Sequence, residues 1–189
     1  MENERIILGI DPGTIIMGYG LIRCNNSTKP ELLAIGALEL HKYDEQFVRL
    51  KFIFDRVTSL IDSFHATELA VESPFYGKNV QSMLKLGRAQ GTAIAAALSR
   101  SIDIYEYAPR KIKLAITGQG NASKEQVATL LQKMINIPEK PSNFDATDGL
   151  AVALCHFFQK KQSQESDKNA KSWKEFVSNN PKRVKTIKN

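Results

Sequence analysis

Four carboxylates have types and positions suited to holding a divalent metal: Asp11, Glu72, Asp145 and Asp148. Asp11 and Glu72 each end an apolar run that is typical of a buried strand, and the two later acids lie one helical turn apart. An unpaired buried carboxylate is energetically costly, so a positive group must lie among these acids. A divalent cation with oxygen ligands is the simplest such group.

The donor types narrow the choice of metal. Carboxylate oxygens without cysteine or histidine suit Mg²⁺ or Mn²⁺ rather than zinc. Four carboxylates can hold two such ions ~3.5–4 Å apart, one assisting an attacking water and one a leaving oxygen, which predicts phosphodiester hydrolysis. His156 lies eight residues beyond Asp148 on the same predicted helix. We therefore expect His156 to pack inside the protein or lie at the surface rather than bind metal.

Each acid also has an ordinary structural explanation. Asp11 with Pro12 and Gly13 can form a simple turn. Acids in the first turn of a helix, such as Asp145, offset the helix dipole without any further role. Glu72 is harder to explain, because its strand is expected to be buried on both faces and the nearest following base is Lys78. The metal hypothesis therefore depends on all four acids meeting.

The elements that must bring these acids together are predicted from hydrophobic periodicity and turn residues. Apolar runs bounded by turn residues predict five strands, at 5–11, 17–24, 31–40, 68–72 and 103–107. Helical periodicity, with a capping box at the start of the third helix, predicts four helices, at about 50–64, 80–100, 123–136 and 144–159.

This order of elements predicts an α/β fold with a mixed five-stranded sheet flanked by helices. The short connections favour antiparallel pairing of the first three strands. Strands 5–11 and 68–72 are the expected neighbours at the centre of the sheet. If they are parallel, Asp11 and Glu72 emerge at the same edge, where open α/β sheets bind their ligands.

The net charge of +6 is unevenly distributed along the chain. Residues 1–159 carry 17 basic and 17 acidic side chains, whereas residues 160–189 carry 9 and 3. Within the neutral part, segment 78–124 holds 8 basic residues against 2 acidic ones. This pattern indicates a polyanionic partner such as nucleic acid, although a solvated surface explains the charge alone equally well. We expect a folded domain at 1–159 and a basic, disordered tail at 160–189.

The sequence has the features of a cytoplasmic protein. No apolar run approaches the ~20 residues that cross a bilayer. The first residues lack the basic start of a signal peptide, and two lone cysteines suit a reducing compartment.

Five motifs together resemble those of the RuvC-type Holliday junction resolvases, a family with a ribonuclease H-like fold. In chain order they lie at 9–14, 72–79, 84–91, 107–110 and 145–151. The resemblance covers residues 5–159, and the order and spacing of the motifs make it far more specific than a lone Asp-Pro-Gly-Thr. The tail extends beyond the matched part.

The resemblance implies a magnesium-dependent endodeoxyribonuclease that resolves Holliday junctions during DNA recombination and repair. Asp11, Glu72, Asp145 and Asp148 would bind two Mg²⁺ ions, with Asp145 standing where some relatives have histidine. The family acts as a homodimer that nicks opposed strands of a four-way junction and leaves 5′-phosphate and 3′-hydroxyl ends. The resemblance also implies that a branch-migration motor is a partner of this protein.

Four further residues have expected roles in DNA binding. Phe75 matches the family's loop aromatic that contacts junction bases, and Lys113 and Lys124 match its basic residues near the scissile phosphate. From the residues alone, Phe75 and Tyr76 lie in a loop with proline and glycine beside Lys78, which is typical of a platform for stacking unpaired bases. A minor core contact is the alternative for these aromatic residues.

One face of the predicted helix 80–100 carries small residues, at Gly87, Gly91 and Ala95. Such a face can pack closely on the sheet or on the same helix of a second chain. The resemblance favours the second chain.

Three other functions stay open at this point. Another ribonuclease H-like nuclease, for example one that processes ribosomal RNA precursors, is the nearest, and the Phe75 loop and Gly87 helix favour the junction enzyme over it. A nucleotide-binding ATPase of the actin type needs two such domains, for which 189 residues are too few. A DNA-binding protein without chemistry leaves the four acids unexplained.

Overall fold

The computed structural model describes residues 4–25, 29–74, 79–137 and 144–169, with side chains as far as Gln159. The chain divides into two compact units, Met1–Phe157 and Phe158–Asn189. The sheet and the candidate site lie in the first unit. In the part of the chain that is described, no helix is both long enough and apolar enough to span a membrane.

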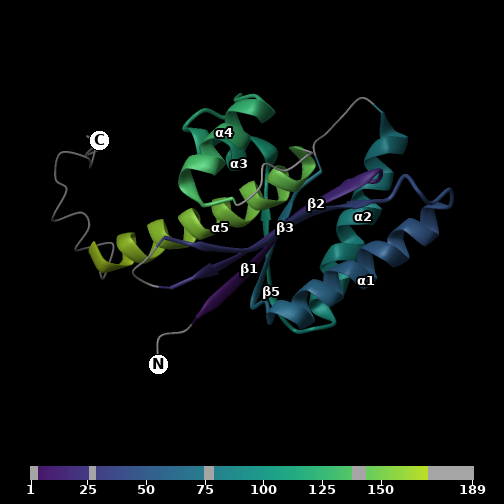
Figure 1. Cartoon of the computed structure of the whole chain (residues 1–189), viewed down its shortest axis with the longest axis horizontal. Coiled ribbons are helices and arrows are strands. Elements are labelled where there is room, and N and C mark those ends of the chain that lie inside the picture. Colours follow the sequence, from purple (N-terminus) through teal and green to yellow (C-terminus); the bar gives the residue numbers. More distant parts are fainter. Residues whose placement is uncertain (1–3, 26–28, 75–78, 138–143, 170–189) are drawn as a thin grey trace, which may run out of the picture. The chain divides into compact units, whose positions relative to one another are not determined.

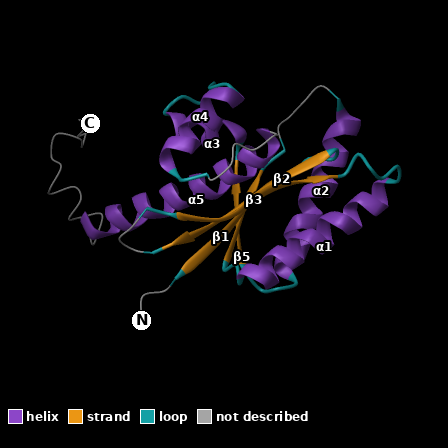
Figure 2. Cartoon of the chain, viewed as in Figure 1, coloured by secondary structure: helices purple, strands orange, loops and turns teal. Residues whose placement is uncertain are grey.

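Five strands form one mixed sheet (Figures 1 and 2). The strands are β1 (Arg5–Asp11), β2 (Ile16–Cys24), β3 (Glu31–Glu39), β4 (Glu68–Glu72) and β5 (Asp103–Tyr107). Their order in the sheet is β3-β2-β1-β4-β5, with antiparallel pairing between β1, β2 and β3 and parallel pairing between β1, β4 and β5. The predicted strands and their mixed arrangement are thus confirmed, with each boundary within one residue.

Five helices are described, divided between the two faces of the sheet (Figure 1). They are α1 (Gln46–Phe64), α2 (Val80–Leu98), α3 (Pro109–Thr117), α4 (Lys124–Met134) and α5 (Phe144–Asn169). Helices α1 and α2 pack with the sheet in the main apolar core, which includes Leu8, Val57 and Ala93. Figure 1 shows α3, α4 and α5 on the other face.

Two helices differ most from the sequence-based prediction, and α1 also begins at Gln46, before the predicted start at about residue 50. Helix α3 was not predicted, because Pro109 follows a strand and was interpreted as its end. Proline also suits the first turn of a helix, and Ile112 and Ile116, one turn apart on α3, are buried. Helix α5 continues to Asn169 instead of ending near Gln159, since the following residues include good helix formers and neither glycine nor proline. The part of the predicted tail at 170–189 lies outside the described residues.

Successive residues of β1 face opposite sides of the sheet. Ile6, Leu8 and Ile10 belong to the core that α1 and α2 cover. Gly9 and Asp11 point to the opposite face, toward α5. Side chains two residues apart on a central strand therefore reach the same helix, and this parity decides which residues can form a site with α5.

Helix α5 packs against glycines of β1 and β2, which have no side chain to separate the helix from the sheet. A Cβ atom at Gly18 would lie 1.8 Å from the backbone oxygen of Asp145, and one at Gly9 would lie 2.4 Å from the backbone nitrogen of Ala153. Gly20 is equally restricted by the α5 backbone. Because these neighbours are backbone atoms, any side chain would displace α5.

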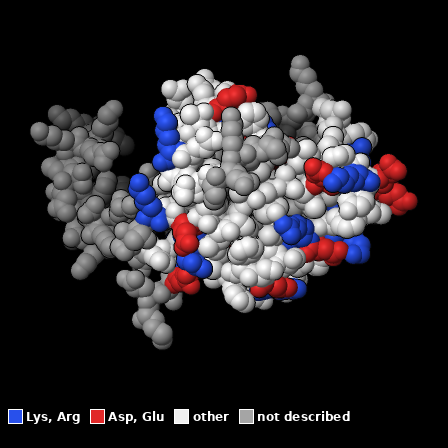
Figure 3. All heavy atoms as spheres, in the orientation of Figure 1, with Lys and Arg blue, Asp and Glu red and all other residues white. Residues whose placement is uncertain are grey.

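Charges of both signs are interspersed on the face of the molecule shown in Figure 3. Exposed ion pairs join Arg100 to Asp62 at 2.7 Å and Lys51 to Asp55 at 2.5 Å. Exposed pairs of this kind contribute little to stability. The mixture agrees with the balanced charge of residues 1–159, so bulk charge does not mark a DNA-binding surface on this face.

Candidate active site

The first two predicted ligands lie at one edge of the sheet. Asp11 is the last residue of β1 and Glu72 is the last residue of β4. The two strands are parallel neighbours, with Ile10 opposite Val71. The expectation that both acids emerge at the same edge is confirmed, and this edge is the carboxyl end of the central strands.

Helix α5 adds the other two acids at the same place. Asp11, Asp145 and Asp148 each offer an oxygen atom, and these atoms all lie within 4.8 Å of one another. Glu72 lines a cavity of about 100 Å³ together with Asp11 and Asp148. Gly18 pairs with Asp11 across the β1–β2 ladder, and its missing side chain leaves room for the start of α5. The four predicted acids therefore converge, with three in the tightest group.

Burial and mutual repulsion disfavour ionisation of these acids. Burial, with the charges of Asp11 and Asp148, raises the pKa of Glu72 from 4.5 to about 8. Burial and the charge of Asp148 raise the pKa of Asp11 from 3.8 to about 6. Burial also raises the pKa of Asp148. Additional positive charge at this site would therefore favour the ionised carboxylates.

Two lysines supply part of the missing positive charge. Lys124 Nζ donates a hydrogen bond to Asp148 Oδ2 at 2.6 Å and lies 3.7 Å from Asp145 Oδ1. Although burial opposes its charge, this hydrogen bond raises the pKa of Lys124. Lys113 of α3 lines the same cavity as Lys124, the first residue of α4. Both predicted lysines therefore meet at the site.

The residues present suit a hard divalent cation. All of the candidate ligand atoms are carboxylate oxygens, which Mg²⁺ and Mn²⁺ prefer. Burial first, and then the neighbouring carboxylates, raise the pKa values of Asp11 and Glu72, and a bound cation would favour their charged forms. Asp11, Asp145 and Asp148 would hold the ion, and Glu72 is placed to share it from the next strand.

Other residues of the site were predicted less completely. Phe75 and Lys78 fall in segment 75–78, outside the described residues. Gly18 was not singled out, although glycines at alternate positions of one strand indicate a close backbone approach. His156 is outside the acid cluster, and it is buried with hydrogen bonds to Glu68 and Tyr107, so it packs inside the protein.

The metal-free protein should lose stability as pH rises from about 5 to 8. The pKa of Glu72 is about 8 in the folded state, above its ordinary 4.5, so folding favours the protonated form. Stability from such a group is present below its ordinary pKa and is lost as pH rises through the folded pKa. At about 1.4 kcal/mol per pKa unit, the expected loss is several kcal/mol.

Urea denaturation in the presence of a chelator at pH 5, 6.5 and 8 measures this loss. The Glu72→Gln variant is the matched comparison, because it cannot ionise at that position, and its free energy of unfolding should depend less on pH. Equal pH dependence of the two proteins would contradict a raised pKa for Glu72 in the folded state.

Comparisons with known proteins agree with this geometry. The family model described as "Crossover junction endodeoxyribonuclease RuvC" matches residues 7–156. The protein of that name from Porphyromonas gingivalis is 57% identical over 186 residues, covering 96% of this chain and 98% of the relative. The protein from Christiangramia forsetii is 56% identical, covering 98% and 95%. The solved structure of Thermus thermophilus RuvC in complex with Holliday junction substrate matches with a TM-score of 0.77 and 29% identity, covering 84% of this chain and 96% of that one.

Proposed function

The chain belongs to the RuvC family of crossover junction endodeoxyribonucleases, and we propose that its four-carboxylate site is the metal-dependent centre that cuts Holliday junctions. The protein is a nuclease with a ribonuclease H-like fold, and members of this family are metal-dependent. The observation that supports the site assignment is the convergence of Asp11, Asp145 and Asp148 beside Glu72 at the carboxyl end of β1 and β4.

The metal proposed for this site is Mg²⁺, bound as two ions, with Mn²⁺ as a substitute. When bound, such ions stabilise the charge of the reacting phosphate and favour deprotonation of the attacking water. Asp11, Asp145 and Asp148 hold and orient the metal, and Glu72 contributes from the adjacent strand. Because these carboxylates are buried or partly buried, their charges are poorly screened and bind a cation strongly.

The lysines have a proposed role on the substrate. Lys124 donates a hydrogen bond to Asp148, but its side chain is 54% exposed and can turn toward the solvent. A divalent cation among the acids would repel this ammonium and release it for the scissile phosphate. Lys113, on the wall of the same cavity, would bind the phosphate with it. Phe75 and Lys78 follow Glu72 closely in sequence, which supports their assignment to base stacking and backbone binding near the cut.

We propose that two chains act together as a homodimer, since paired nicks require two sites. The outer face of α2, formed by Val80, Leu84, Gly87, Gly91 and Leu98, is the proposed interface. Leu84 and Leu98 are 53% and 61% exposed, and no described atom lies within 4 Å of a Cβ built at Gly87 or Gly91. The alternative that these glycines pack on the sheet is therefore wrong. Ile94, which lies on the same helix, packs against the core and is not part of this face.

Three wider assignments are proposals that follow from the family. The family match ends at residue 156, which supports a nuclease domain at 1–159 followed by a basic segment at 160–189 that binds DNA as a polycation. A branch-migration motor is the proposed partner, because resolution must follow movement of the crossover. A cytoplasmic location is the third proposal, because a junction-cutting enzyme must reach the cell's DNA.

Exchange of the metal tests the proposed cofactor. Mg²⁺ and Mn²⁺ should support nicking of a synthetic four-way junction, whereas Ca²⁺ should support binding without turnover, because its larger and looser coordination positions the water poorly. Gel-shift and nicking assays on the same protein separate the two steps. Nicking that continues in the presence of a chelator would refute a metal-dependent centre.

A further inference from the structure

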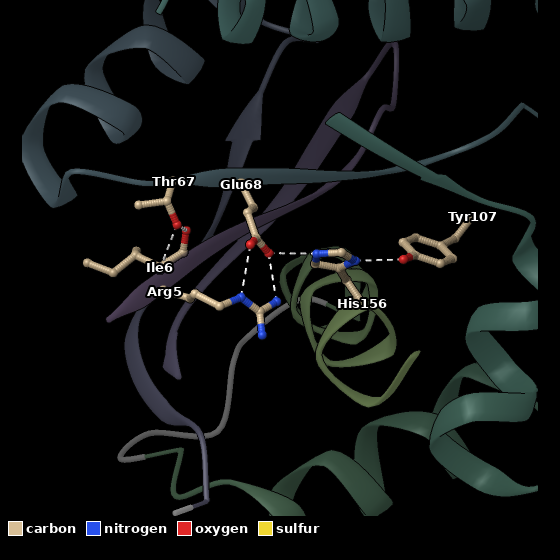
Figure 4. Close-up of polar contacts among 6 residues, drawn as sticks. All are labelled: Arg5, Ile6, Thr67, Glu68, Tyr107 and His156. Atoms are coloured by element: carbon tan, nitrogen blue, oxygen red, sulfur yellow. Dashed lines mark hydrogen bonds and ion pairs between the residues drawn. The ribbon is translucent and has the colours of Figure 1, made fainter. Parts of the chain in front are cut away.

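A second set of polar residues, buried or partly buried, joins β1, β4, β5 and α5 through hydrogen bonds (Figure 4). Arg5 donates two hydrogen bonds to Glu68, from Nε to Oε1 at 2.9 Å and from Nη2 to Oε2 at 2.7 Å. His156 Nε2 lies 2.7 Å from Glu68 Oε2, and His156 Nδ1 lies 2.6 Å from the Tyr107 hydroxyl. Tyr105 stacks on the imidazole at 4.2 Å.

The direction of the hydrogen bond between His156 and Glu68 is set by the carboxylate. Arg5 stabilises Glu68 as a carboxylate, which can only accept, so His156 Nε2 carries a proton and donates to it. Burial raises the pKa of Tyr107 to about 12, so its hydroxyl keeps its proton beside Nδ1 of His156. Both ring nitrogens of His156 therefore have a partner, as a histidine that is only 1% exposed requires.

Each element that carries a catalytic acid also carries a member of this set. Strand β1 holds Arg5 and Asp11, β4 holds Glu68 and Glu72, and α5 holds His156 with the two aspartates. Tyr107 extends the set to β5, where it pairs with Glu72 across the β4–β5 ladder. The polar set therefore ties together the three elements whose ends form the metal site.

The spacings along β4 and α5 are matched. From Glu68 to Glu72 the strand rises four residues, or about 13 Å. From His156 back to Asp148 the helix spans eight residues, or about 12 Å. A bond between Glu68 and His156 at one end therefore brings Asp148 level with Glu72 at the other. A shift of one residue along α5 would move Asp148 by about 1.5 Å and turn it by roughly 100°.

Glycines beneath α5 reduce the interlocking of side chains between this helix and the sheet, so a directional contact can contribute to its axial position. Helices usually keep their axial position through side chains that interlock with the surface below. Beneath α5 that surface includes Gly9, Gly18 and Gly20, which limit how close the helix comes but offer no side chain to interlock. The hydrogen bond from His156 to Glu68 has the direction and burial to add an axial restraint.

We propose that His156 and Glu68 are positioning residues that set the axial register of α5, so that Asp145 and Asp148 meet Asp11 and Glu72 in the geometry that binds metal. The inference rests on the proposed metal site. It predicts that loss of this one hydrogen bond, about 12 Å from the acids, weakens metal binding.

Mn²⁺ binding to the intact, DNA-free protein, followed by electron paramagnetic resonance, tests this proposal. His156→Asn keeps an amide near the position of Nδ1 but loses the bond to Glu68, and it should weaken Mn²⁺ binding about tenfold or more. His156→Gln places its amide nitrogen near the position of Nε2, keeps the bond, and should retain most of the affinity. Glu68→Leu removes the same bond from the other side and should behave as His156→Asn, so the test does not depend on one variant folding.

A matched control separates positioning from general destabilisation. Val57→Ala opens a cavity in the core under α1, on the other face of the sheet, and should lower the melting temperature without changing Mn²⁺ affinity. The proposal is overturned if His156→Asn binds Mn²⁺ like the wild type, or if Val57→Ala weakens binding to the same degree. Failure of the wild type to bind Mn²⁺, or binding by Asp11→Asn at wild-type affinity, would instead refute the metal site itself.

Discussion

Replacing Asp11 with asparagine is expected to slow nicking of a four-way junction by about 10³-fold or more, since metal catalysis supplies several kcal/mol and each 1.36 kcal/mol is a factor of ten. Glu72→Gln should have an effect of the same kind. Both changes keep the shape of the side chain and remove its charge. Because the lysines proposed to contact DNA are untouched, binding to the junction should persist, and a gel shift in parallel with the nicking assay measures it.

Asp103→Asn is the matched control for this prediction. Asp103 is an exposed acid at the start of β5, the opposite end of the sheet from Glu72, and its replacement should leave nicking unchanged. A second readout comes from stability. Without metal, Asp11→Asn should melt at a higher temperature than the wild type, because a buried repulsive charge has been removed. Near-normal nicking by Asp11→Asn or Glu72→Gln would remove that residue from the mechanism.

Replacing Gly91 with leucine should convert a dimer into a folded monomer that no longer makes coordinated nicks. Within one chain there is room for the new side chain, since no described atom lies within 4 Å of a Cβ at this position. Leucine also has a better helix propensity than glycine. At a close contact between two α2 helices, however, overpacking costs about 1–3 kcal/mol or more, and two-fold symmetry applies that cost twice.

Light scattering measures the oligomeric state of this variant, and a cruciform plasmid reports whether both strands are cut within one binding event. Thr129→Leu on the exposed side of α4 is the control for adding a leucine to a helix surface, and it should remain a dimer. A Gly91→Leu protein that is still dimeric and still cuts in pairs would place the interface on another part of the chain.

Local sequence patterns predicted most of the fold. The strands that end at Asp11 and Glu72 are short apolar runs bounded by turn residues. Such a pattern is visible within about ten residues of sequence, and the predicted boundaries agree with the structure. Helix α3 was missed because a nine-residue helix that begins with Pro109 looks like the end of the preceding strand. Pro109 is compatible with both the end of a strand and the start of a helix. Only the burial of Ile112 and Ile116 in the structure distinguishes the two interpretations.

The sequence analysis predicted the candidate metal ligands but not the residues that contact one another behind them. The four acids share a chemistry that a sequence displays directly. The contacts of His156 with Glu68, 88 residues earlier, and with Tyr107, 49 residues earlier, depend on how α5 crosses the sheet. Lys113 and Lys124 were expected at the site only from the family resemblance, and the structure brings them beside Glu72 from two later helices. Such long-range pairings follow from topology, which local periodicity does not encode.

Cleavage of three synthetic DNA substrates by the intact protein with Mg²⁺ tests the central claim most directly. The substrates are a four-way junction, a linear duplex of the same sequence and the corresponding single strand. The account predicts paired nicks in opposed strands of the junction, with ends that DNA ligase can seal, and no comparable cutting of the other two. Equal cutting of all three, or an intact junction at saturating protein and metal, would contradict it.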